Sequence, residues 1–159
     1  MSANGKKLVH TEDYVKILEE LTSENKTVGV PVSGNSMAPF LISQRDHVIF
    51  QKPDRPLRKG DIVFFRRDSG EYILHRIYRI RKNGYFILGD AQTKPEGPVR
   101  EDQIFGLVTK IRRKGTWIDS GDFWWQFFEK VWIRIIPLRP VIRAAYGVIK
   151  RSELRGFLI

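Results

Sequence analysis

From Val28 onward, apolar and polar residues alternate in short runs, and this period of two constrains the fold more than any other feature. Turn signals separate the runs: Lys59-Gly60-Asp61, Asp68-Ser69-Gly70 and Asn83-Gly84. An Asn-Gly pair between two apolar runs is the strongest short signal for a β-hairpin. The pattern predicts strands at 28–32, 47–51, 61–66, 71–81, 85–88 and 104–112.

Many short strands at this spacing predict a mainly β fold, an antiparallel β-sandwich or partial barrel rather than a parallel α/β sheet. A helix is expected over 11–25, with a stripe of Tyr14, Ile17, Leu18 and Leu21 facing the core. The stretch 92–98 has two prolines and no apolar residue, so it is expected to be a loop. Three regions follow: an N-terminal helix region (1–27), a β-rich domain (28–119) and a helical tail (120–159).

The tail differs from the rest of the chain in its aromatic content. Between Asp122 and Ile136, polar residues form one narrow stripe at helical spacing, and aromatic residues occupy much of the remainder, namely Trp124, Trp125, Phe127, Phe128 and Trp132. Pro137 and Pro140 end this helix, and a second segment, 141–151, carries Arg143, Lys150 and Arg151.

This combination predicts an amphipathic tail whose residues 121–151 contact membrane surfaces peripherally. Indole rings favour the membrane–water interface, and basic residues attract anionic headgroups. Two alternatives stay open: the aromatic face packs on the β-domain, or it forms a dimer contact.

Charge and composition limit the partners and cofactors. The formal net charge is +10, which favours an anionic partner; we expect the membrane surface and not nucleic acid. The absence of cysteine excludes disulfides and thiolate metal sites, and three scattered histidines do not indicate a zinc site, so no cofactor or metal is expected. No apolar run is long enough to span a membrane, and Met1–Lys7 has no apolar core typical of a secretory signal, so we expect a cytoplasmic, membrane-peripheral location.

Three residues are candidates for catalysis. Ser36 lies in the Gly-containing turn Val32-Ser-Gly-Asn-Ser-Met-Ala-Pro39, and His75 lies between two isoleucines on one face of the strand 71–81. A serine hydroxyl needs a base to become a good nucleophile, and an apolar setting keeps an imidazole neutral, as a base must be. Asp90, after a strand end, could orient the imidazole as in a triad, and Glu96 is the alternative.

Five segments in this order resemble the type I signal peptidase family of serine peptidases: Ser33-Gly-Asn-Ser-Met-Ala-Pro39, Lys59-Gly-Asp-Ile-Val-Phe64, Ile73-Leu-His-Arg-Ile77, Phe86-Ile-Leu-Gly-Asp90 and Ile104-Phe-Gly-Leu-Val108. In that family the serine of Ser-Met is the nucleophile, and the archaeal and endoplasmic-reticulum branch has His-Arg where the bacterial branch has its lysine base. The resemblance therefore implies Ser36 and His75 as catalytic residues, with Asp90 as the third, and an antiparallel β fold.

This chain departs from that family at three places, one of which is Gly89-Asp90-Ala91-Gln92, where the family has a Gly-Asp-Asn-Asn-like stretch. Members usually have a transmembrane anchor before the serine, where this chain has the helix 11–25. Many also carry a second serine two residues before the nucleophile, where this chain has Gly34, so that oxyanion binding would rest on backbone N–H groups, with Asn35 as a helper.

The leading hypothesis is a serine endopeptidase that cleaves an extended leader or signal-type peptide. A second hypothesis is a non-catalytic β-domain that binds a peptide or the membrane surface. A third is a self-cleaving repressor, which the sequence does not favour: such proteins use Ser with Lys and carry a DNA-binding helix-turn-helix, whereas this chain has His75 and a single N-terminal helix.

Overall fold

The structure is a computed structural model that describes residues 11–145. Its elements are α1 (Thr11–Ser23), β1 (Val28–Pro31), β2 (His47–Gln51), β3 (Ile62–Arg66), β4 (Tyr72–Arg81), β5 (Gly84–Leu88), β6 (Glu96–Val99), a short 3₁₀ turn (Glu101–Gln103), β7 (Ile104–Arg113), β8 (Thr116–Ile118) and α2 (Phe123–Gln126). After α2 the chain stays helical in short pieces, at Phe127–Val131, Trp132–Arg134 and Ile136–Leu138. Residues 139–145 are also helical.

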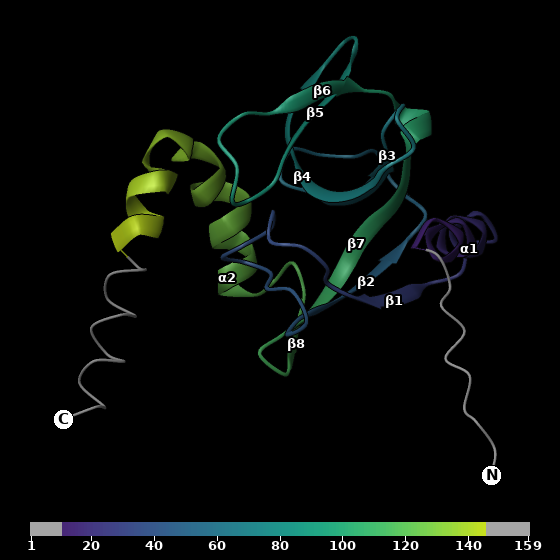
Figure 1. The fold of residues 1–159 in the computed structure, drawn as a ribbon, viewed down its shortest axis with the longest axis horizontal. Coiled ribbons are helices and arrows are strands. Elements are labelled where there is room, and N and C mark those ends of the chain that lie inside the picture. Colours follow the sequence, from purple (N-terminus) through teal and green to yellow (C-terminus); the bar gives the residue numbers. More distant parts are fainter. Residues whose placement is uncertain (1–10, 146–159) are drawn as a thin grey trace.

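The strands form one antiparallel sheet in the order β1-β2-β7-β3-β4-β5-β6, with β8 paired to β7. The strands β3 to β6 curl into a ring, while β1, β2 and β7 extend below them (Figure 1). In the same view α1 lies on one side of the sheet and α2 with the following helical pieces on the other (Figure 1). The predicted mainly β fold with an N-terminal helix and a C-terminal helical tail is confirmed.

The six predicted strands are present within a residue or so of their predicted ends, and two more occur that the pattern did not predict. The stretch expected as a loop contains β6, and β8 forms a hairpin with β7. In that hairpin Lys114 and Gly115 have φ values of 50° and 84°, the left-handed pair that a tight β-turn requires. The β4–β5 turn falls on Lys82 and Asn83, because Arg81 pairs with Gly84.

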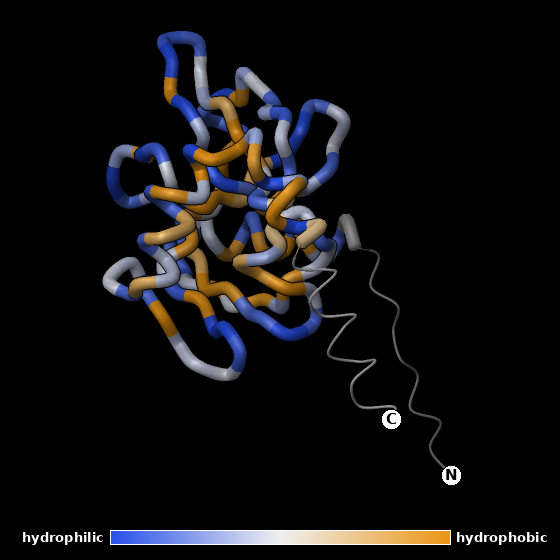
Figure 2. Tube along the Cα trace, turned by 90° about the vertical axis from the view of Figure 1, so that its left-hand side faces the viewer, coloured by the Kyte–Doolittle hydropathy of each residue, from blue (hydrophilic) through white to orange (hydrophobic). Residues whose placement is uncertain are grey.

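Two apolar clusters fill the molecule. The larger joins α1, the Ser36 loop, β2 and the aromatic residues of the tail, including Trp125, Phe128 and Trp132. The smaller lies between β3, β4, β5 and β7 and includes Val63, Phe65 and Ile77. Apolar segments accordingly gather inside the molecule, and polar segments form its outer loops (Figure 2).

Half of the stripe expected on α1 faces the core, since Leu18 and Leu21 pack on the larger cluster. Leu18 and Thr22 are buried and Val15 packs on the larger cluster, whereas Tyr14 and Ile17 are exposed. The tail packs one aromatic face on the β-domain, as the first alternative stated, with Trp125 and Phe128 against Phe40. Phe123, Trp124 and Val131 remain exposed. Residues 1–10 of the expected helix region and 146–151 of the second tail segment lie outside the described residues.

Candidate active site

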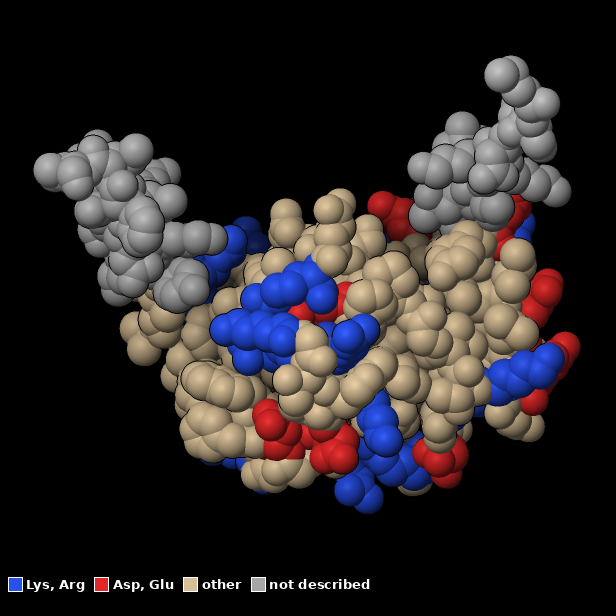
Figure 3. Space-filling view, turned by 90° about the horizontal axis from the view of Figure 1, so that it is seen from below, with Lys and Arg blue, Asp and Glu red and all other residues tan. Residues whose placement is uncertain are grey.

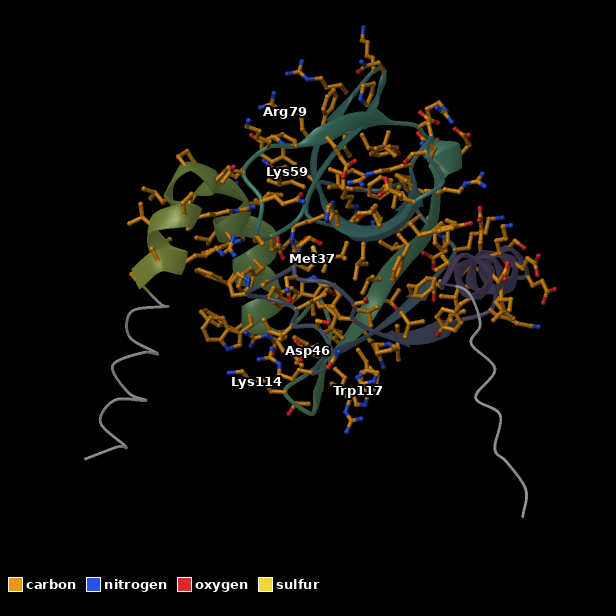
Figure 4. The ribbon with its side chains drawn as sticks, viewed as in Figure 1. Met37, Asp46, Lys59, Arg79, Lys114 and Trp117 are labelled. Atoms are coloured by element: carbon orange, nitrogen blue, oxygen red, sulfur yellow. The ribbon has the colours of Figure 1, made fainter. Side chains whose placement is uncertain are left out.

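Ser36 lies in a loop that its neighbours anchor in the core. Met37, Phe40 and Leu41 are almost fully buried, so the residues after the serine point inward. Figure 4 shows Met37 in the interior of the molecule. Gly34 has φ 78°, a conformation that costs a glycine little, and it turns the chain just before the serine. Ser36 itself is only partly buried.

His75 lies in the middle of β4, where it pairs with Val63 of β3. Only 2% of the side chain is exposed. Burial lowers the pKa of the imidazole below its ordinary value, and the nearby Glu96 carboxylate offsets this in part. The side chain is therefore neutral at pH 7, as the sequence predicted for a base that must accept a proton.

The Ser36 loop and His75 meet at Gly89, directly after β5. A Cβ atom built on Gly89 would lie 2.5 Å from the carbonyl oxygen of Ser36 and 3.0 Å from Nε2 of His75. The two atoms are therefore no farther apart than the sum of these distances. Only a glycine fits between them. The N–H of Ala91 also donates a hydrogen bond of 2.8 Å to the Ser36 carbonyl, which ties the serine loop to the same segment.

Within the part of the chain that the structure describes, no hydrogen bond joins the Ser36 hydroxyl to His75. The structure thus brings the nucleophile candidate and the base candidate into one place without the final contact between them. Catalytic hydrogen bonds are often long in enzymes without substrate and tighten when substrate binds.

The other nitrogen of His75 faces Glu96, the first residue of β6. Nδ1 lies 3.4 Å from Oε1 of Glu96, although the alignment is not that of a hydrogen bond, so Nδ1 is buried without a partner. Arg67 holds Glu96 with two hydrogen bonds of 2.8 and 2.9 Å. Burial alone would raise the pKa of Glu96, but the Arg67 guanidinium outweighs it and lowers the pKa, so Glu96 is ionised at pH 7.

Asp90 has a different environment. Both of its carboxylate oxygens accept hydrogen bonds of 2.9 Å from Arg76, and both side chains are almost completely buried. Arg76 and His75 are neighbours on β4, so their side chains point to opposite faces of the strand. Asp90 therefore forms an ion pair with Arg76. Of the two carboxylates considered as partners of the imidazole, Glu96 is the one beside His75.

A pocket of about 400 Å³ opens next to Glu96. It is lined by Arg67, Glu96 and residues 91–94. One wall of the pocket is thus the loop that contacts Ser36, and the other is the carboxylate that faces His75. Neither Ser36 nor His75 lines the pocket itself.

Sequence reasoning did not assign roles to Gly89, Arg67 or the tail residues Trp132 and Arg139, which contact the 89–92 loop. The Gly89-Asp90-Ala91-Gln92 run was visible, but the partners of its backbone lie far along the chain. No group of three metal-ligating side chains occurs in the described range 11–145. Over the same range, no helix is long and apolar enough to cross a membrane.

Comparison with known proteins identifies the family of the chain. The model of the family described as Peptidase S24-like matches residues 2–109. No curated protein matches the chain. The match covers Ser36, His75 and Glu96 and extends over more than half of the 159 residues. It supports this peptidase family and not specifically the type I signal peptidases that the sequence motifs resemble. The chain belongs to the Peptidase S24-like family.

Proposed function

We propose that the protein is a serine endopeptidase in which Ser36 is the nucleophile and His75 the general base. One observation carries the proposal: the imidazole lies between the serine loop, which its Nε2 faces, and the Glu96 carboxylate, which its Nδ1 faces. This is the arrangement of a nucleophile, a base and an orienting carboxylate. Membership of a peptidase family supports the same assignment.

The proposed reaction follows from these positions. The Ser36 hydroxyl oxygen attacks the carbonyl carbon of the scissile peptide bond while Nε2 of His75 takes the hydroxyl proton. The tetrahedral intermediate collapses, the C–N bond breaks, and His75 returns the proton to the departing amine. Water, deprotonated by His75, then hydrolyses the acyl-enzyme to a carboxylic acid and free Ser36. In this reaction a small movement of Glu96 toward Nδ1 would complete a hydrogen bond from the Nδ1–H and so hold the tautomer that leaves Nε2 free.

Backbone N–H groups of the serine loop would stabilise the oxyanion. A Cβ on Gly34 would meet no other atom within 4 Å, so the position that carries a serine in many signal peptidases is open here. Asn35, which is exposed in the same loop, is the side chain best placed to assist.

We propose an extended peptide as the substrate, of the leader or signal type that the sequence resemblance implies. The pocket beside Glu96 supports this proposal, because β6, at one end of the strand order, borders it. Pairing with a terminal strand fixes the backbone of an extended peptide and presents alternate side chains to the protein. One such side chain would enter the pocket.

Labelling with a fluorophosphonate tests the enzyme assignment without knowledge of the substrate. The wild type should be modified at Ser36, as peptide mapping by mass spectrometry would show. Ser36→Ala should abolish labelling, His75→Ala should reduce it by several orders of magnitude, and Ser33→Ala, an exposed serine in the same loop, should leave it unchanged. A wild type that is not labelled while folded would support a non-catalytic peptide-binding domain instead.

We also propose that a basic and aromatic face binds anionic membrane surfaces. It lies around the β7–β8 hairpin and the start of α2. Its members are exposed or nearly half exposed, namely Arg112, Lys114, Trp117, Phe123 and Trp124. Lys114 and Trp117 both lie at the lower end of the molecule (Figure 4), and Lys and Arg side chains gather in the middle of the surface seen from below (Figure 3).

Contacts within this face combine positive charge with aromatic rings. Trp117 pairs with Arg112 across the hairpin, and the Arg113 guanidinium lies 5.5 Å from the Trp124 ring centre. Phe123, 70% exposed, packs edge-on against Trp124. Exposed aromatic rings beside cations match the chemistry of an anionic lipid surface. The membrane contact proposed here involves only the first residues of the expected region 121–151, together with the β7–β8 hairpin.

A further inference from the structure

Side chains from the C-terminal segment, here residues 121–145, hold the backbone of the loop 89–92. Arg139 donates hydrogen bonds to the carbonyls of Gly89 and Gln92, at 3.1 and 2.8 Å. Trp132 donates its indole N–H to the Asp90 carbonyl at 2.8 Å. Arg143 donates to the Ala91 carbonyl at 2.9 Å. All the carbonyl groups of the loop are therefore bound by one later segment of the chain.

We propose that three residues of the C-terminal segment, Trp132, Arg139 and Arg143, are positioning residues that act on Ser36 and His75 through the 89–92 loop. The inference rests on the proposed function, because it assumes that Ser36 and His75 react together. It adds residues that lie beyond the stretch matched by the family model.

The loop is the element on which the geometry of both reacting groups depends. Gly89 lies against Nε2 of His75, and the Ala91 N–H binds the Ser36 carbonyl. A shift of the loop would therefore displace the serine relative to the imidazole. A misplacement of about 1 Å in a reacting pair can cost about 10²-fold in rate.

Arg139 is suited to hold this loop rigidly. Its side chain is 1% exposed and stacks over the Trp132 ring, with 5.4 Å from the guanidinium carbon to the ring centre. A second guanidinium nitrogen binds the Trp132 carbonyl at 3.1 Å, so one side chain fixes both the loop and its own segment. Burial lowers the pKa of Arg139, but a guanidinium remains protonated at any ordinary pH, so its donors are always available.

The buried charge has a further consequence for the loop. Asp90 is already neutralised by Arg76, so Arg139 has carbonyl oxygens rather than a carboxylate as its hydrogen-bond partners. Burial of an arginine side chain costs folding free energy unless hydrogen-bond partners are held in place around it. The cost of disturbing these hydrogen bonds therefore resists movement of the loop.

Fluorophosphonate labelling of Ser36 in the full chain tests the proposal. Arg139→Ala and Trp132→Phe should each slow labelling by at least about tenfold, and up to the ~10²-fold expected of a misplaced pair. Arg139→Lys, which keeps the charge but has a single nitrogen to donate, should recover part of the rate. Millimolar guanidinium should partly restore Arg139→Ala, and the same concentration of urea should not.

Two controls separate positioning from stability. Arg134→Ala changes an exposed arginine of the same segment and should label at the wild-type rate. Leu18→Ala, in the buried face of α1, should lower the melting temperature without slowing labelling of the folded protein. Arg143→Ala serves as a second variant if Arg139→Ala does not fold, since Arg143 is exposed and should be replaceable.

The outcomes distinguish this inference from the proposed function. If the wild type is not labelled at all, the proposed function fails. If the wild type is labelled and Arg139→Ala, Trp132→Phe and Arg143→Ala label equally fast, the function stands and the positioning role is wrong. If Leu18→Ala, at a similar loss of melting temperature, slows labelling as much as Arg139→Ala does, lost stability explains the effect and the positioning role is wrong.

Discussion

His75 and Glu96 face each other, with 3.4 Å between Nδ1 of the imidazole and Oε1 of the carboxylate. Nε2 of the same imidazole faces the Ser36 loop through Gly89. One nitrogen of the imidazole thus faces the loop of the proposed nucleophile, and the other faces an ionised carboxylate. Asp90, which the sequence motif favoured for that role, forms a buried ion pair with Arg76.

The two carboxylates should therefore respond differently to conversion into amides. Glu96→Gln should lower the rate of Ser36 labelling at least about tenfold, equivalent to ~1.4 kcal/mol of activation free energy, because the amide no longer favours the Nδ1–H tautomer. Thermal unfolding should change little, since Glu96 is partly exposed.

Asp90→Asn should instead destabilise the fold. It leaves the buried Arg76 guanidinium without its counter-charge, a loss of about 3–5 kcal/mol in free energy of unfolding. Chemical denaturation compares the two variants directly. Inactivity of Asp90→Asn at full stability, with an active Glu96→Gln, would reverse the assignment.

Activity should rise with pH and level off below neutrality. Burial lowers the pKa of His75, so the midpoint of the rise should lie below the ordinary imidazole value of 6.5. Glu96 raises the pKa of His75, and Glu96→Gln should therefore move the midpoint to still lower pH. Labelling rates across the pH range, with NMR titration of the His75 ring, measure both midpoints. If the wild-type labelling rate is independent of pH from 5 to 8 and Glu96→Gln leaves the His75 titration unaltered, His75 is not the general base.

The lowered pKa of His75 also makes the free energy of unfolding depend on pH. Because the folded protein binds the proton on His75 more weakly than the unfolded chain, the stabilisation is present above the unfolded pKa and is lost as pH falls below it. His75→Gln should reduce this pH dependence.

Gly89→Ala should inactivate the protein more than any other single methyl addition in the site. The new Cβ would lie 2.5 Å from the Ser36 carbonyl oxygen, a backbone atom that cannot easily move away, and 3.0 Å from Nε2 of His75. We expect a loss of about 10²-fold or more in labelling rate, because the methyl would force the pair apart.

Gly29→Ala is the matched control for this change. Its Cβ on β1 would meet Ile49 at an ordinary 3.8 Å, so labelling should be unaffected. If Gly89→Ala is as active as Gly29→Ala, the serine and the imidazole do not meet where the structure places them.

Local patterns predicted most of this fold and the burial of His75. Strands β2 and β3 follow from their alternation, and the burial of His75 follows from its position between Ile73 and Ile77 on one face of β4. The pattern could not predict β6, because Glu96-Gly-Pro-Val99 has the composition of a loop and becomes a strand only by pairing with β5.

Contacts over long sequence distances explain the part of the candidate site that local patterns could not predict. Both Asp90 and Glu96 follow β5 closely, and only the tertiary register decides which carboxylate reaches His75. The hydrogen bonds from Arg139 to Gly89 and Gln92 join residues that are 50 and 47 positions apart in the sequence. No local pattern predicts such contacts. The aromatic tail looked apolar on most of its surface because one side packs on the sheet and another remains exposed.

Membrane binding should depend on the basic and aromatic face. The full-length protein should sediment with anionic phospholipid vesicles at low salt and remain in solution with neutral ones, because Arg112 and Lys114 attract anionic headgroups. Replacement of Phe123 and Trp124 by serine should weaken binding to the anionic vesicles, as should Arg112→Gln combined with Lys114→Asn, each charge contributing about 1 kcal/mol. Asparagine suits position 114, where φ is 50°.

The matched control is Tyr14→Ser with Ile17→Ser, which removes exposed apolar side chains from α1 on the other side of the sheet (Figure 1). It should bind vesicles like the wild type, because α1 lies away from the β7–β8 hairpin. A wild type that stays in the supernatant with anionic vesicles at low salt would show that the face does not bind lipid. Equal loss of binding in the α1 control would show that exposed apolar area in general, rather than this face, causes sedimentation.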